Sequence, residues 1–132
     1  STPAKVVLQS DVHIDYEGKL VTLAQYHNVT LDLNGYSLKS TQTLTNNGTF
    51  TIKDTSEEHT GKIINNERLI FKNNGTATIE NAEFVATNSL AIENAGTMTI
   101  NDALINNVNG TFYSNTSITN IQYRKRYNLG MV

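Results

Sequence analysis

The acidic side chains that could do chemistry are few and scattered. Asp54 and Asp102 occupy equivalent positions of a sequence repeat, each directly after a short run of alternating apolar and threonine residues. If repeat units stack at roughly 4.8 Å, the two carboxyls lie roughly 10 Å apart, near the separation used by inverting glycoside hydrolases. However, Asn81 fills the position between them, and Asp and Asn both favour turns. We therefore expect Asp54 and Asp102 to be corner residues rather than a catalytic pair.

A second acidic group lies near the start of the chain, in the stretch "DVHIDYE". Asp11, His13, Asp15 and Glu17 alternate there, so on a β-strand they would share one face. Oxygen and imidazole ligands could hold a divalent cation at such a face. The simpler interpretation is the solvated face of an end strand, so we predict no metal site, no cofactor and no catalytic residue.

Composition excludes several classes of function. The chain has no cysteine, which removes disulfides, thiolate catalysis and cysteine-metal sites. Its net charge is -2 and its basic run is the short "RKR" at 124–126, so we expect no nucleic-acid partner. No apolar stretch reaches the roughly 18 residues of a membrane-spanning helix, so we expect no membrane insertion.

The elements that would position these residues come from a repeat of 21 residues, seen when "NNGTATIEN" (73–81) recurs as "NAGTMTIND" (94–102). This shift aligns two columns, which we take as the structural ladder: Asn73, Asn94 and Asn115, and Ile79, Ile100 and Ile121. Asparagine side chains in one column could bond along a stack of coils. The spacing from Gly48 to Gly75 is 27, which predicts a six-residue insertion at 56–61, and a spacing of 19 sets Leu31 and Leu33 against Phe50 and Ile52.

Each repeat contains a run that alternates threonine with an apolar residue, which predicts short half-buried strands. The threonines form a candidate outward face: Thr49, Thr51, Thr76, Thr78, Thr97 and Thr99. A repeat of about 20 residues with short strands makes one turn of a solenoid, in which each strand pairs in parallel with its counterpart one coil away. We predict an all-β parallel β-helix of about five to six coils over residues 1–132. Residues 1–25 would form the N-terminal cap and first coil, 26–123 the repeating coils and 124–132 the C-terminal cap.

The segments "VTLDLNGYSL", "NNGTFTIKD", "NNGTATIEN" and "NAGTMTIND" resemble the right-handed parallel β-helix repeats of pectate-lyase-like proteins. That superfamily includes bacterial surface proteins and bacteriophage structural proteins as well as lyases and hydrolases, and the likeness covers about residues 20 to 123. Its lyases typically hold calcium with clustered acidic residues, and its hydrolases gather aspartates on one strand face. Neither signature is visible in this sequence.

These observations favour a non-catalytic structural or surface-interaction protein. We expect a virion module, such as a phage capsid decoration, or an extracellular cell-surface module that contacts protein or carbohydrate, with self-association left open. The alternative is a polysaccharide lyase or glycoside hydrolase of the same superfamily. A minor alternative is ice binding, because the threonine array resembles the ice-binding face of some antifreeze proteins. We expect Thr30 and Asp32 to break this array on one side, and Ile118 and Asn120 on the other.

Overall fold

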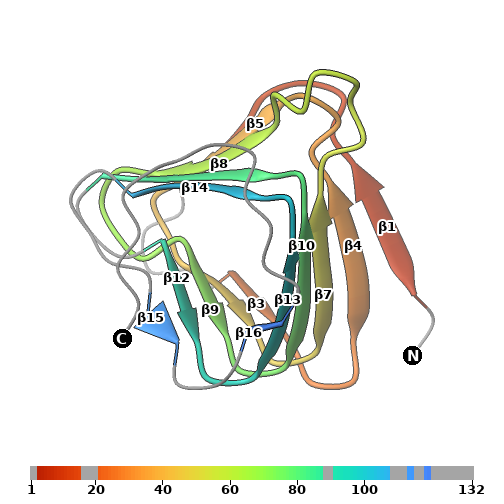
Figure 1. Ribbon diagram of the computed structural model, residues 1–132, viewed down its shortest axis with the longest axis vertical. Coiled ribbons are helices and arrows are strands. Elements are labelled where there is room, and N and C mark those ends of the chain that lie inside the picture. Colours follow the sequence, from red (N-terminus) through yellow and green to blue (C-terminus); the bar gives the residue numbers. More distant parts are fainter. Residues whose placement is uncertain (1–2, 16–20, 88–90, 108–112, 115–117, 120–132) are drawn as a thin grey trace.

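The protein is a parallel β-solenoid. The computed structural model describes residues 3–15, 21–87, 91–107, 113–114 and 118–119, with side chains as far as residue 103. All its described regular elements are β-strands, and three parallel sheets face one another around a shared interior (Figure 1). Among these residues, no helix has the length and apolar character that a membrane crossing requires. The predicted all-β fold of stacked parallel coils is confirmed, and its right-handed sense stays a prediction.

Each sheet collects every third strand, as a three-sided coil requires. Sheet A contains β1 (Ala4–Val7), β4 (Asn28–Asp32), β7 (Thr49–Lys53), β10 (Thr76–Glu80), β13 (Thr97–Asn101) and β16 (Ile118–Thr119). Sheet B contains β2 (Val12–Ile14), β5 (Ser37–Ser40), β8 (Lys62–Asn65), β11 (Glu83–Ala86) and β14 (Leu104–Asn107). Sheet C contains β3 (Val21–Leu23), β6 (Leu44–Asn46), β9 (Phe71–Asn73), β12 (Ile92–Asn94) and β15 (Tyr113–Ser114).

We number the coils by their strands, so that coil 1 is β1–β3, coil 2 is β4–β6, and coil 5 is β13–β15. Among the described residues, the chain makes about four turns from β1 to β13, somewhat fewer than the five to six predicted. Beyond β13 the described backbone continues through β14, β15 and β16, each of which pairs with a strand of the preceding coil.

The 21-residue repeat sets the register between coils 4 and 5. Ile79 pairs with Ile100, and Phe84 with Ile105, as the shift predicted. Further along, Asn94 pairs with Ser114 and Met98 with Ile118, which is a shift of 20. The predicted alignment of Asn94 with Asn115 is therefore wrong, because Ser114 takes that position. Asn115 and Ile121 themselves lie outside the described residues.

The predicted spacing of 19 at coil 2 is wrong. Leu31 pairs with Ile52, so the true spacing is again 21. The error arose because Leu31 and Leu33 alternate like a strand, whereas Leu33 lies beyond the end of β4 and is fully buried at the corner. This corner residue contributes to the core without taking part in the strand alternation.

The interior is filled by the inward side chains of all three sheets. Ile52, Ile79 and Ile100 are fully buried in sheet A, as period-two alternation predicted. In the middle coils the Phe71 ring lies between two others, edge-on to Phe50 with centroids 5.9 Å apart and tilted against Phe84 at 6.4 Å. Such aromatic pairs add to the stabilisation from burial, so these rings help to stabilise the centre of the stack.

Glycines at the corner between sheets C and A allow successive coils to approach closely. A Cβ atom added to Gly75 or Gly96 would collide with the backbone carbonyl of the glycine one coil earlier, Gly48 or Gly75 respectively. Neither residue has a positive φ. The requirement for glycine is therefore space between coils rather than backbone conformation.

Candidate functional site

Asp54, the first candidate acid, is used to build the corner between sheets A and B. Its side chain is only 1% exposed, and its carboxylate accepts hydrogen bonds from the amides of Gly35 (2.9 Å), Ser56 (2.9 Å) and Gly61. Burial by itself would raise the pKa of Asp54, but contacts with Ser56 and with the amides of Gly61 and Gly35 outweigh it and lower the pKa. The carboxylate thus ties coil 2 to both ends of the loop between β7 and β8, which holds the insertion predicted at 56–61.

Asp32 fills the same role one coil earlier, and sequence reasoning missed it. Its carboxylate accepts hydrogen bonds from the Asn34 amide (2.9 Å), the Thr55 amide (3.1 Å) and the Thr55 hydroxyl (2.7 Å). Burial alone would raise the pKa of Asp32, whereas these bonds and the nearby charge of Lys53 lower it overall. Asp32 and Asp54 together fasten the insertion to the corner of the preceding coil.

Asp102, the second candidate acid, is a one-residue corner. Its φ is +49°, and Asn81 has a φ of +59° at the equivalent position of the preceding coil. Asn and Asp adopt this left-handed conformation more readily than other residues that carry a Cβ. The prediction that this column turns the chain is confirmed, and its members do so in two different ways.

A buried ladder of asparagines lines the corner between sheets C and A. Asn46 donates to Asn73, and Asn73 donates to Asn94, each from Nδ2 to Oδ1 at 2.8 Å. All three side chains are fully buried. The predicted bonding of Asn73 with Asn94 is therefore confirmed, and Asn46 extends the ladder into coil 2. Asn46 could have been recognised, because "NNG" at 46–48 recurs at 73–75.

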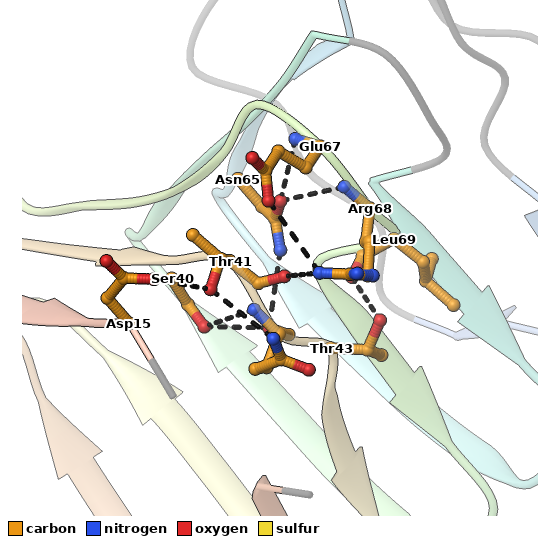
Figure 2. A network of polar contacts seen from close by, with 9 residues as sticks. Asp15, Ser40, Thr41, Thr43, Asn65, Glu67, Arg68 and Leu69 are labelled. Atoms are coloured by element: carbon orange, nitrogen blue, oxygen red, sulfur yellow. Dashed lines mark hydrogen bonds and ion pairs between the residues drawn. The ribbon is translucent and has the colours of Figure 1, made fainter. Parts of the chain in front are cut away.

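The third corner, between sheets B and C, contains a polar network that crosses three coils (Figure 2). Asn65 accepts hydrogen bonds from the amides of Glu67 and Arg68 at 2.9 and 2.8 Å, and Arg68 donates from Nη1 to the carbonyl of Thr41 at 2.5 Å. The Thr41 hydroxyl reaches Asp15 of coil 1 at 3.5 Å, which is at the limit for a hydrogen bond. Side chains at this corner, as at the other two, are used to satisfy backbone groups.

The acidic group around β2 faces outward, as predicted. Asp11, His13 and Asp15 are exposed, while Val12 and Ile14 pack against the core. Asp11 accepts from the amide of Ser37 at 2.9 Å, and His13 pairs in register with Lys39. Glu17 lies outside the described residues. Within the described chain, no three His, Asp or Glu side chains converge on a point where a metal ion could sit.

The threonine face of sheet A is more extensive than expected. Its first column contains Thr49, Thr76 and Thr97, and its second contains Thr30, Thr51, Thr78 and Thr99. Thr30 therefore extends the array, contrary to the prediction that it breaks it. Asp32 lies opposite Lys53 in a neighbouring column. At the other end Ile118 pairs with the inward Met98 and Thr119 pairs with Thr99, whereas Asn120 lies outside the described residues.

An apolar cavity of about 370 Å³ opens among the side chains of coils 1 and 2. Its lining includes Val6, Leu8, Val12, Leu31 and Leu38. It continues the core toward the first coil, where Val6 remains 48% exposed.

The C-terminal cap predicted at 124–132 lies outside the described residues.

Comparison of this chain with protein-family models, with curated proteins and with solved structures gave no match. The structure itself establishes a parallel β-solenoid. Kinship with the pectate-lyase-like superfamily stays a prediction from the sequence.

Proposed function

We propose that the protein is a non-catalytic β-solenoid scaffold, a module of a virion or cell surface whose outer faces contact another protein or a glycan. The observation that carries this proposal is the position of Asp54. Both of its carboxylate oxygens are engaged by backbone amides in a buried corner. A catalytic carboxylate must instead present a lone pair to its substrate.

The internal polar groups support the same proposal. Hydrogen bonds of the asparagine ladder (Asn46, Asn73 and Asn94) point inward and join successive coils. The carboxylate of Asp32 also bonds between coils. These bonds fix the backbone of successive coils, and satisfied buried networks of this kind give a unique and rigid structure. A rigid stack is suited to presenting its outer faces in a constant arrangement.

Aromatic side chains offer a contact point on the outside of this stack. Tyr26 is 78% exposed and has a φ of +72°, an uncommon backbone conformation for a residue of this size. Tyr36 is 38% exposed at the corner after β4. Tyrosine rings combine an apolar surface with a polar end and are enriched at binding interfaces, so Tyr26 is our first candidate contact residue.

The catalytic alternative is tested with the intact protein and a panel of uronic-acid and neutral glycans. We expect no turnover, measured as new reducing ends or as unsaturated products that absorb in the ultraviolet. Asp102→Asn is the matched variant, because asparagine already occupies the equivalent corner at Asn81. Turnover by the wild-type protein that disappears in Asp102→Asn would overturn the proposal.

The binding part is tested by titrating the same glycans and purified phage particles against the wild-type protein and Tyr26→Ala. We expect binding without turnover and weaker binding by Tyr26→Ala, with Tyr26→Phe as the control that keeps the ring. If neither the glycans nor the particles bind, the proposed contact role is wrong.

A further inference from the structure

The outward face of sheet A carries a two-dimensional array that no corner or core requirement explains. Thr49, Thr76 and Thr97 are exposed, and the second column of Thr30, Thr51, Thr78 and Thr99 is half-buried beside them. Neighbouring strands of a sheet lie roughly 4.8 Å apart, and alternate residues of a strand lie roughly 6.6 Å apart. Hydroxyl and methyl groups therefore repeat with two fixed spacings across this face.

The buried asparagine ladder holds this array in place. Asn46 donates from Nδ2 to the carbonyl of Thr76 at 3.0 Å, and Asn73 donates to the carbonyl of Thr97 at 2.9 Å. On the other side of each residue, the amides of Thr76 and Thr97 donate to the carbonyls of Gly48 and Gly75, both at 2.9 Å. The first threonine column is thus fixed by side-chain and backbone bonds at the same point of coils 4 and 5.

The array has no charged member. Ionisable side chains begin in the neighbouring column, where Lys53 pairs with Glu80, and at the coil 1 end, where Lys5 pairs with Thr30. The face also has no aromatic member, unlike the ring platforms on which sugars stack. An uncharged ligand that is itself periodic in two dimensions matches this surface better than a charged polymer or a single sugar.

We propose that the threonine face binds ice. Ice presents an uncharged lattice of water molecules that repeats in two dimensions, as the hydroxyl and methyl groups of the threonine columns do. Threonine hydroxyls can join the ordered water while the methyl groups rest against it. This inference rests on the scaffold character of the proposed function, but it does not depend on any protein or glycan partner.

The test measures how much of the intact protein enters slowly growing ice, together with thermal hysteresis. The wild-type protein should be enriched in the ice relative to an unrelated β-sheet protein of similar size. Thr76→Tyr should abolish this enrichment, because the bulky ring interrupts the middle of the exposed column. Thr78→Tyr should act in the same way from the second column.

The matched control is Val85→Tyr, which places the same ring on an outward position of β11 in the same coil but on sheet B. It should leave ice uptake unchanged, and urea unfolding of all variants shows that the comparison is made between folded proteins. Exclusion of the wild-type protein from ice would overturn the inference, as would an equal loss in Thr76→Tyr and Val85→Tyr. Either result leaves the glycan and particle assays to decide the proposed function separately.

Discussion

Buried asparagine side chains join successive coils one residue at a time. Asn73 lies at the centre of the ladder, accepts from Asn46, and donates to Asn94 and to the carbonyl of Thr97. Its neighbour Asn74 is exposed and makes a single bond of the same chemistry, from Nδ2 to Oδ1 of Asn47 at 2.9 Å. Two adjacent asparagines thus differ both in burial and in the number of bonds they make, so substituting each in turn compares a buried, multiply bonded site with an exposed one.

We predict that Asn73→Ala lowers the free energy of unfolding by about 2–4 kcal/mol, because it removes several bonds and leaves buried partners incompletely satisfied. Asn74→Ala should cost about 0.5 kcal/mol or less, as is usual for exposed sites. Urea unfolding of both variants measures the difference. If both variants lose the same free energy of unfolding, the buried ladder stabilises the protein no more than an exposed bond does.

Asp54 makes stability depend on pH. Its pKa is lowered in the folded protein, so its stabilising effect is complete above the unfolded value of roughly 3.9 and is lost as the pH falls through the folded value. Asp54→Asn keeps one acceptor oxygen but turns an amide toward a backbone donor, which should cost about 1–3 kcal/mol at pH 7. The difference in free energy of unfolding between wild type and Asp54→Asn, called the gap below, should stay constant down to about pH 5 and narrow below about pH 4.

Unfolding in urea between pH 7 and pH 2 measures this gap. The pKa of Asp32 is also lowered. Asp32 is present in both proteins, so its contribution to the pH dependence largely cancels. Asp102→Asn is the control and should change stability little at any of these pH values, because Asn81 already adopts the same conformation. A gap that is as wide at pH 2.5 as at pH 7 would show that the charge of Asp54 is not what stabilises the corner.

At the scale of the strand, charged side chains distinguish one coil from the next. Coil 3 carries a lysine on each sheet, and coil 4 carries the glutamate that pairs with it in register: Lys53 with Glu80, Lys62 with Glu83 and Lys72 with Glu93. All six side chains are partly exposed. Opposite charges at directly paired positions favour that register, and like charges oppose it.

We predict that the double variant Lys62→Glu with Lys72→Glu is destabilised by about 1–2 kcal/mol, because each pair then contains two negative charges. Adding Glu83→Lys and Glu93→Lys should restore most of the loss. These two pairs suit the test because the other strand neighbours of the lysines are Ser37 and Thr45, which carry no charge.

The measurement is urea unfolding of the double and quadruple variants at low and high salt. The destabilisation of the double variant should shrink at high salt, because these side chains are partly exposed and their interactions are screened. A quadruple variant no more stable than the double variant would show that the pairing of charges does not support the register.

Strand positions were predictable from the sequence where corners have constant length. Between coils 4 and 5 the shift of 21 gave the correct partners of Ile79 and Phe84. The predicted spacing of 19 at coil 2 was wrong because Leu33, a buried corner residue, continues the alternation of the strand before it. A self-comparison of the sequence detects repeated side-chain types, but it does not show where the backbone leaves the strand.

The acidic corners show a second limit of sequence reasoning. The turn role of Asp102 followed from the alignment with Asn81, whereas the hydrogen bonds by which Asp32 and Asp54 join neighbouring coils did not. Those bonds connect residues 19 to 23 positions apart, such as Asp54 with Gly35 and Asp32 with Thr55. They form only once the coils are stacked, so no local sequence pattern predicts them.

At the scale of the whole molecule, the solenoid is a one-dimensional stack in which each coil is stabilised by its neighbours. Coils 3 and 4 have a coil on both sides and contain Phe71 and Phe84, both fully buried. Coil 1 pairs on one side only among the described strands, its β1 side chains are exposed, and the apolar cavity lies beneath it. Stability should therefore fall from the centre of the stack toward coil 1.

Native-state hydrogen exchange tests this gradient residue by residue. We predict the slowest exchange for amides of β7 and β10, which are paired on both sides, and faster exchange for β1, β2 and β3 at the end.

Ile79→Ala should lower the free energy of unfolding by about 2–5 kcal/mol, because it opens a cavity in a closed core. Val6→Ala should cost about 1 kcal/mol or less, since Val6 is already 48% exposed. If coil 1 instead exchanges as slowly as the centre, and Val6→Ala costs as much as Ile79→Ala, then the first coil is closed in solution by a further layer, such as a second copy of this chain, and sedimentation of the same samples would detect that copy.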